Sequence, residues 1–173
     1  MTTSVRSRVA SLLALAAVVV INPLTAAEKE SSQPDKDIVE LARESGEFNM
    51  FLRLLAETDH LEKLKKEGTF TVFAPTDKAF DHLGMNLIDS LLHPSQKHYR
   101  NRLIGHHILE EIVRSDDSIG KGEQEVKTLA GTRVKYIAEH NRFFLETAAL
   151  EKNDLEASNG VLHGIDRILV PRY

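Results

Sequence analysis

Apolar side chains recur at helical spacing through the first half of the chain and at strand spacing through the second half. Between residues 37 and 109, apolar positions lie three and four residues apart in segments separated by glycine or proline, which is typical of amphipathic helices. Asp35 or Asp37 can cap the start of the first of them, and Gly46 can end it. The pattern predicts helices over about 38–45, 48–55, 60–67, 76–82, 87–92 and 96–103.

Segments rich in β-branched and aromatic residues, which favour strands, occur once early and several times late. The early one is Thr69–Phe73. The segments 132–137 and 142–145 are joined by a short linker and predict a β-hairpin. Further short strands are expected at 126–129, 155–157 and 160–165, with 168–170 as an optional last one. Helices gathered early and strands gathered late predict an α+β fold rather than alternating βαβ units.

The N-terminal segment has the three regions of a secretory signal peptide. Arg6 and Arg8 precede the apolar run 9–21, and small residues continue up to Ala27. We therefore expect residues 1–27 to be removed on export. An uncleaved membrane anchor is the alternative, but the apolar run is shorter than the ~20 residues of a spanning helix.

The composition of the mature chain limits the class of protein it can be. A polar leader, 28–36, precedes a segment, 37–173, that has the size of a single domain. The whole chain has a formal charge of −4, and loss of the signal arginines makes it more acidic, so it has no electrostatic reason to bind nucleic acid. It has no cysteine for disulfides or lipid attachment, and no apolar tail comes after Pro171. These features predict a soluble protein, secreted or periplasmic, without stable membrane insertion after cleavage.

One segment combines a strand, a corner and a helix within a dozen residues. Phe73 is the last large residue of the expected strand, since Pro75 has no N–H to donate to a sheet. Thr76 can cap the next helix, Asp77 places a negative charge in its first turn, and Phe80 is its large apolar residue. This order predicts a sharp strand-to-helix corner at Pro75.

A second segment runs from Asn159 to Pro171. Asn159-Gly160 predicts a turn in which the glycine has a positive φ, and the apolar residues after it predict a strand. His163 lies within that strand, and Asp166 comes directly after it.

Together the two segments resemble the two sequence blocks that define fasciclin-like domains, the extracellular adhesion modules repeated in fasciclin and periostin. Residues 72–80 match the first block and residues 159–171 the second, with Leu162 where the family pattern has isoleucine. The resemblance implies a wedge-shaped, β-sandwich-like core with several helices packed around it. It also implies a binding module, not an enzyme, that contacts a protein or polysaccharide of the cell surface or extracellular matrix.

The resemblance also implies an adhesion motif. An Asp-Ile pair of the family corresponds here to Asp154-Leu155. An exposed carboxylate beside an aliphatic residue is the chemistry by which integrin-type receptors complete a metal coordination shell. The alternative is that Asp154 begins a strand and Leu155 packs into the core.

A second family motif, a Tyr-His pair flanked by branched aliphatic residues, corresponds to His106-His107, with histidine at the tyrosine position. We expect His107 to be a buried structural histidine, because a buried ring needs a hydrogen-bond partner, for example in the Pro75–Asp77 corner. An adhesive role for the pair is the alternative.

Catalytic and metal-binding patterns are missing from the sequence. It contains no Gly-x-Ser-x-Gly elbow and no phosphate-binding glycine loop. Its eight histidines lack metal-binding spacing, and 116–120 lacks that of a calcium loop. We therefore predict no catalytic residue, metal or cofactor. The basic stretch 96–102 is expected to be a solvated helix face, with binding to an acidic polysaccharide as the alternative.

Two other function classes compete with adhesion. In the first, a groove between the helices and the β-core holds a small apolar ligand in the periplasm. In the second, histidine and aspartate hold a metal for hydrolysis. The sequence specifies no oligomeric state.

Overall fold

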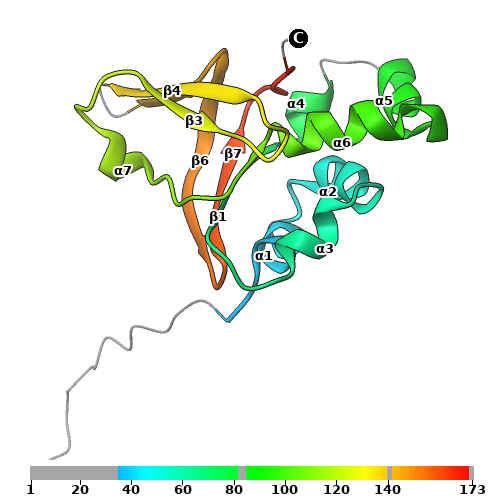
Figure 1. Cartoon of the computed structure of the whole chain (residues 1–173), viewed down its shortest axis with the longest axis horizontal. Coiled ribbons are helices and arrows are strands. Elements are labelled where there is room, and N and C mark those ends of the chain that lie inside the picture. The colour runs from blue at the N-terminus through cyan, green and yellow to red at the C-terminus, as the bar shows by residue number, and fades with distance from the viewer. Residues whose placement is uncertain (1–34, 82–84, 140–141, 172–173) are drawn as a thin grey trace, which may run out of the picture. The chain divides into compact units, whose positions relative to one another are not determined.

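The computed structural model describes residues 35–81, 85–139 and 142–171, so the expected signal peptide lies outside the described residues (Figure 1). Most helices precede most strands, although β1 lies between α3 and α4, and this order confirms the predicted α+β class. The helices are α1 (Ile38–Ser45), α2 (Asn49–Ala56), α3 (His60–Leu64), α4 (Asp77–Asp81), α5 (Met85–Leu92), the 3₁₀ helix η1 (Pro94–Gln96), α6 (Lys97–Gly105) and α7 (Ser115–Ser118). The strands are β1 (Phe70–Pro75), β2 (Ile108–Leu109), β3 (Gln124–Lys127), β4 (Arg133–Glu139), β5 (Arg142–Leu145), β6 (Ala148–Ala157) and β7 (Gly160–Ile165).

Local chemistry accounts for the ends of the first helix. The Asp37 carboxylate accepts a hydrogen bond from the Glu40 backbone N–H, and the Glu40 carboxylate accepts one from the Asp37 N–H, which forms a capping box. Gly46 ends α1 in the left-handed conformation, with φ of 69°. Of the two predicted caps the structure uses Asp37, and the predicted end at Gly46 is confirmed.

The seven strands of the described residues form one sheet in the order β2-β1-β7-β6-β5-β4-β3. Among these neighbouring strands, only β1 and β7 run parallel, with Phe70 opposite Gly160 and Pro75 opposite Ile165. The two edges of the sheet meet again, because Leu109 of β2 forms an isolated bridge with Thr128, just beyond β3. The sheet is therefore strongly curved and almost closed, and the two sequence motifs lie side by side in it.

Hydrophobic residues gather on both sides of β1, whose six residues are all buried. Val72 belongs to a cluster shared with the helices that includes Phe48 and Phe51. Its neighbour Phe73 belongs to a second cluster inside the curved sheet, with Leu145 among its members. Because successive strand residues point to opposite faces, a continuous apolar run serves both clusters. Helices α1 to α6 lie on the side of the sheet formed by β1 and β7, away from β3 and β4 (Figure 1).

Several boundaries differ from the predicted ones. β6 has ten residues, where only 155–157 was expected, because register shifts interrupt its pairing with β7 and obscure its pattern. The helix 60–67 ends earlier, at Leu64, and the segment 168–170 forms no strand. α7 was not predicted. Among the described residues, no helix has the length and apolar character needed to cross a membrane.

Candidate functional site

The corner after β1 joins three elements. The Thr76 N–H donates to the Ile165 carbonyl of β7, at 3.0 Å. The Asp77 carboxylate does not serve its own helix: it accepts from the Met50 N–H at 2.8 Å and from the Asn49 side-chain amide at 2.9 Å, and so caps α2. Phe80, on the next turn, is 2% exposed. These motif residues hold helices and sheet together.

The Asn159-Gly160 turn also connects helices to the sheet. The Asn159 side chain accepts from the Ile38 N–H at 3.0 Å and donates to the carbonyls of Leu64, at 2.5 Å, and Lys66, at 3.1 Å. Gly160 has φ of 156°, and a Cβ there would lie 2.0 Å from the Phe70 carbonyl oxygen. The glycine is therefore required by close approach of two parallel strands.

His163 is fully buried and lies against two aromatic rings. Its ring stacks on Phe73 at a centroid distance of 5.1 Å and on Phe143 at 6.2 Å. Nε2 donates to the Val113 carbonyl at 2.8 Å, and Nδ1 accepts from the Asp154 N–H at 3.1 Å. Burial lowers the pKa of His163, although the Val113 carbonyl and the Asp154 charge oppose this. A neutral ring is what this pair of hydrogen bonds requires, since only one nitrogen carries a proton.

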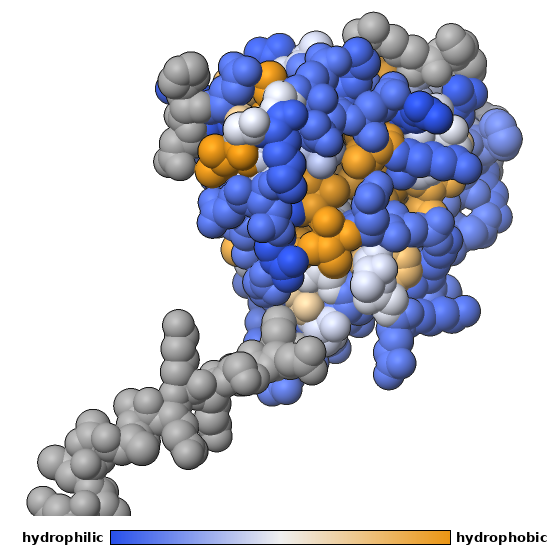
Figure 2. Space-filling model, turned by 60° about the vertical axis from the view of Figure 1, so that its left-hand side comes forward, coloured by the Kyte–Doolittle hydropathy of each residue, from blue (hydrophilic) through white to orange (hydrophobic). Residues whose placement is uncertain are grey.

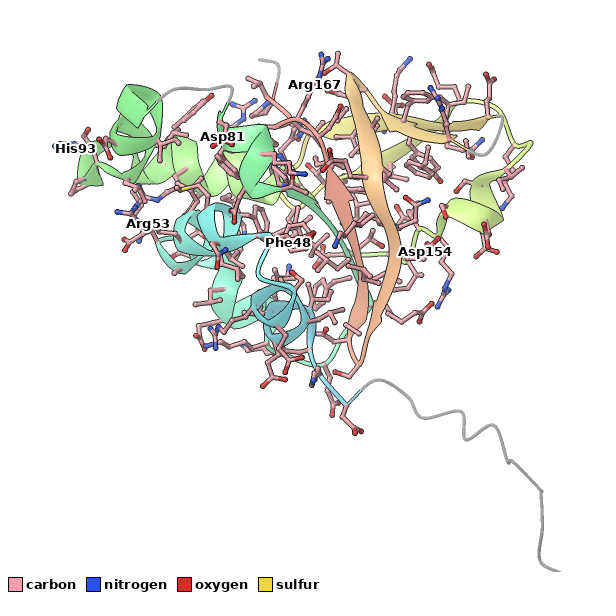
Figure 3. The ribbon with its side chains drawn as sticks, turned by 180° about the vertical axis from the view of Figure 1, so that it is seen from behind. Phe48, Arg53, Asp81, His93, Asp154 and Arg167 are labelled. Carbon is pink, nitrogen blue, oxygen red and sulfur yellow. The ribbon has the colours of Figure 1, made fainter. Side chains whose placement is uncertain are left out.

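Asp154 lies in the middle of β6 and is anchored rather than free. Its backbone is left-handed, with φ of 50°. Its carboxylate accepts from the Ser115 N–H at 2.9 Å and from the Ser115 hydroxyl. Asp154 and Ser115 form a chain of hydrogen bonds with His163 and Val113, which we call the Asp154 clasp. It ties the start of α7 to β6 and β7. Figure 3 shows Asp154 on β6, on the side away from Phe48 and the helices.

Leu155 has an intermediate position beside Asp154. It is partly buried, packs against the core shared with the helices and pairs with Leu162 of β7. Asp154 therefore contacts Ser115, whereas the adjacent Leu155 contacts the hydrophobic core.

His106 and His107 are both buried at the end of α6. The His107 ring donates through Nδ1 to the Leu103 carbonyl at 2.8 Å and accepts from the Leu169 N–H at Nε2, at 3.0 Å. The expected hydrogen-bond partner in the Pro75–Asp77 corner is wrong, because both ring nitrogens are bonded elsewhere, to α6 and to the C-terminal segment after β7. Burial lowers the pKa of His107 to about 4.

His106 makes a different set of contacts. Its Nδ1 shares a hydrogen bond with the Thr132 hydroxyl at 2.5 Å, and its buried Nε2 has no partner among the described residues. Burial, followed by the positive charge of Arg102, lowers the pKa of His106 to about 4. The structure therefore does not bring this pair together with the Asp154 clasp, since the two groups contact different segments.

Asp166, the last motif residue, closes the other end of the β6–β7 pair. Its carboxylate accepts from the Ala149 N–H at 2.7 Å, and its own N–H donates to the Ala149 carbonyl at 3.1 Å. Within the described parts of the chain, no three histidine, aspartate or glutamate side chains are grouped so that they could hold a metal ion.

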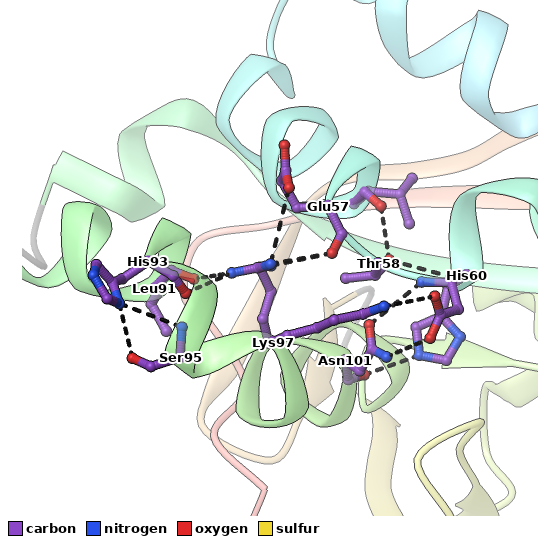
Figure 4. Close-up of polar contacts among 11 residues, drawn as sticks. Glu57, Thr58, His60, Leu91, His93, Ser95, Lys97 and Asn101 are labelled. Atoms are coloured by element: carbon purple, nitrogen blue, oxygen red, sulfur yellow. Dashed lines mark hydrogen bonds and ion pairs between the residues drawn. The ribbon is translucent and has the colours of Figure 1, made fainter.

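Two important residues were missed from the sequence, Ser115 and Arg100. Arg100 is only 2% exposed and donates to the carbonyls of Glu57, Leu91 and His93, at the ends of α2 and α5 (Figure 4). The prediction that the stretch 96–102 is a solvated helix face is therefore wrong for Arg100. Its spacing from the apolar pair Leu103-Ile104 could have indicated the buried face.

One side of the molecule combines polar and apolar surface. Figure 2, in which the side carrying α7 and β4 is turned forward, shows hydrophobic side chains gathered near the middle of a mainly hydrophilic face. Phe144 and Ile119 are among the large apolar residues that are exposed, at 37% and 51%. A hydrophobic centre with a polar rim is typical of protein-binding surfaces.

Comparison with known proteins identifies relatives of this fold. The family model "Fasciclin domain" matches residues 46–171. Protein sll1483 of Synechocystis sp. is 33% identical over 135 residues, covering 78% of this chain and 73% of that protein. Human periostin is 29% identical over 126 residues, and rabbit transforming growth factor-beta-induced protein ig-h3 is 27% identical over 138. The matches cover 72% and 80% of this chain but only 15% of periostin and 20% of ig-h3.

A solved structure agrees with the sequence relatives. The FAS1 domain pair from the insect cell adhesion molecule fasciclin I matches with a TM-score of 0.69 and 15% identity, over 79% of this chain and 51% of that one. At this identity the match concerns the fold alone. Together with the family match over residues 46–171, it leads to one conclusion: the chain belongs to the fasciclin domain family.

Proposed function

We propose that this chain is an extracytoplasmic binding module that adheres to a protein or polysaccharide of the cell surface or matrix. The observation that carries the proposal is the fasciclin family match across residues 46–171. Further support comes from the relatives periostin and ig-h3 and from the fold shared with an insect cell adhesion molecule. The proposed role involves no catalysis.

The proposal includes export of the chain. Residues 1–27 are proposed to be a cleaved signal peptide and 28–36 a flexible leader before the domain 37–173. The arginines ahead of an apolar run support this organisation.

We further propose Asp154 and Leu155 as part of the contact surface, with His106 and His107 in a structural role. Burial of both histidines supports the second assignment. For Asp154, the carboxylate must exchange Ser115 for a cation or donor of the partner, because both hydrogen bonds from Ser115 end on it. The proposed site is therefore available only when the Asp154 clasp opens locally.

Immobilised mature protein tests this assignment by the retention of cells or matrix extract. Asp154→Gly removes the carboxylate while glycine tolerates the left-handed backbone. Ser115→Ala is the matched control, because it weakens the same clasp but leaves the carboxylate in place. We expect retention to fall with Asp154→Gly and to persist or rise with Ser115→Ala. Equal retention by wild type and Asp154→Gly contradicts a role for this carboxylate.

A further inference from the structure

A hollow surface region lies beyond the carboxyl ends of the parallel strands β1 and β7. It contains two cavities, of about 590 and 500 Å³, that share Lys78 and Glu151 in their walls. Their sizes are in the range of small-molecule sites. Figure 3 shows Arg167, which lines the larger cavity, near the upper end of the sheet and far along β6 from Asp154. The region is thus separate from the Asp154 clasp.

Two cations line the larger cavity together with two carboxylates, and neither cation donates a hydrogen bond to a described residue. The side chain of Arg167 is 65% exposed, and its nearest carboxylate oxygen, on Asp166, is 3.9 Å from Nε, which is beyond hydrogen-bond distance. Lys78, on α4, forms no hydrogen bond or ion pair with any described residue, although it lines the same cavity. Both groups are available to an external anion.

Each carboxylate of the same cavity already accepts a hydrogen bond from the protein. Glu151 accepts a hydrogen bond from the Thr76 hydroxyl at 3.1 Å, and Asp166 accepts one from the Ala149 N–H at 2.7 Å. These bonds fix one oxygen of each acid to the protein. The N–H groups of Lys78 and Arg167 are the donors of this cavity that have no hydrogen-bond acceptor among the described residues.

The remaining wall of the larger cavity is aliphatic. It is formed by Ala79, Ile168 and Val170. Ile168 packs partly against the core, and Val170 is 58% exposed, the most exposed large apolar residue of the described chain. An exposed valine beside two available cations offers both halves of a site for an amphipathic anion.

The smaller cavity lacks this combination. Its second lysine, Lys152, is paired with Glu47 at 2.5 Å, and its Asp77 carboxylate caps α2. The charge of Lys152 is thus paired within the protein, and no aliphatic residues line this smaller cavity. Only the larger of the two cavities combines unbonded cations with an aliphatic wall.

We propose that the larger cavity binds a small aliphatic carboxylate. The carboxylate accepts hydrogen bonds from the Lys78 ammonium and the Arg167 guanidinium, and the hydrocarbon chain covers Ile168 and Val170. This site is independent of the adhesive role proposed above, because it shares no residue with the Asp154 clasp. It gives the domain a ligand-binding capacity in addition to macromolecular contact.

Titration of the ¹⁵N-labelled mature protein with decanoate, below its micelle-forming concentration, tests the site by NMR. Decyltrimethylammonium has a similar chain and the opposite charge, and it serves as the ligand control. We expect saturable shifts of the amides around Lys78, Arg167 and Val170 with decanoate and none with the cation. Absence of saturation by decanoate, equal shifts with both ligands, or shifts confined to other segments overturns the proposal.

Variants then separate the site from general charge effects. Lys78→Met combined with Arg167→Met should weaken decanoate binding at least tenfold, and Val170→Asp should weaken it similarly. Arg53→Met combined with Lys127→Met changes the net charge equally at two exposed positions outside the cavity and should leave binding unchanged. Equal weakening by both double variants contradicts the site. A thermal melt of each variant verifies folding.

Discussion

Asp154 and Ser115 lie 39 residues apart in sequence, yet both the backbone N–H and the hydroxyl of Ser115 donate to the Asp154 carboxylate. The Asp154 N–H in turn donates to the buried ring of His163. Asp154 therefore links the start of α7 to the centre of the sheet. The left-handed backbone at this position is compatible with aspartate, since side chains other than glycine, asparagine and aspartate rarely adopt it.

The clasp should contribute measurably to stability. Ser115→Ala removes one hydrogen bond and should lower the free energy of unfolding by about 1 kcal/mol. Asp154→Ala removes both and places alanine at positive φ, which should cost roughly 2–4 kcal/mol. Asp154→Gly should recover about 1 kcal/mol of that loss, because glycine relieves the backbone strain. Urea denaturation measures all three, and an Asp154→Ala variant as stable as Ser115→Ala contradicts the role of the clasp.

Acid should destabilise the domain through its buried histidines. The pKa values of His106 and His107 fall from 6.5 to about 4 on folding, so below pH 6.5 the unfolded chain binds protons that the native chain does not. The stabilisation is complete above pH 6.5 and is lost as the pH falls towards 4, by roughly 3 kcal/mol per histidine. Denaturation curves across this range measure the slope.

His107→Leu isolates one of these groups. At pH 7 it should cost about 1–3 kcal/mol, because the Leu169 N–H and the Leu103 carbonyl lose their partner. It should also reduce the slope of the free energy of unfolding against pH in the acid range, because about one proton fewer is taken up on unfolding. A slope identical to that of wild type means that His107 is not the group that titrates.

Gly160 and Gly131 form a matched pair for a steric test. Gly160→Ala places a Cβ 2.0 Å from the Phe70 carbonyl oxygen and should destabilise by about 3 kcal/mol or more. Gly131 also has a positive φ, of 78°, but has nothing within 4 Å of a Cβ, so Gly131→Ala should cost only about 1 kcal/mol. Similar melting temperatures for the two variants contradict the close approach of β1 and β7.

Arg100 should be sensitive to a change that keeps its charge. Its guanidinium reaches carbonyls at the ends of both α2 and α5, and a lysine ammonium lacks the fork needed to do this. Arg100→Lys should lower the free energy of unfolding by about 2–3 kcal/mol. Lys97→Met, on the same helix but exposed and paired with Asp59 at 3.4 Å, should change it by less than about 0.5 kcal/mol. Equal effects contradict the capping role.

The sequence predicted the helices, strands and turns of the molecule better than the contacts between distant segments. Pro75 and the Asn159-Gly160 turn indicate backbone constraints that act locally, so they located the end of the first strand and the start of the last one. The pairing of these strands, β1 and β7, was found only in the structure. β6 was predicted only at 155–157, because the left-handed Asp154 and the register shifts break the alternation on which strand recognition depends.

Contacts between distant segments were the hardest to predict. Nothing near Ser115 indicates that Asp154 is its partner, and nothing near His107 indicates Leu169, because tertiary packing alone makes these bonds. Arg100 was assigned to a solvated helix face with the rest of the stretch 96–102, although a charged group can be buried when carbonyl acceptors surround it. Both kinds of error concern partners that the sheet and helices bring together only after folding.

The central claim is that this fasciclin domain binds a macromolecule of its own cell surface or matrix. A pull-down from the native cell envelope with immobilised mature protein, analysed by mass spectrometry, tests it most directly. Beads carrying an unrelated domain of similar charge serve as the control. We predict reproducible enrichment of one or a few surface proteins or polysaccharides over that control. No enrichment by a domain that is folded by circular dichroism, from either protein or polysaccharide fractions, contradicts the claim.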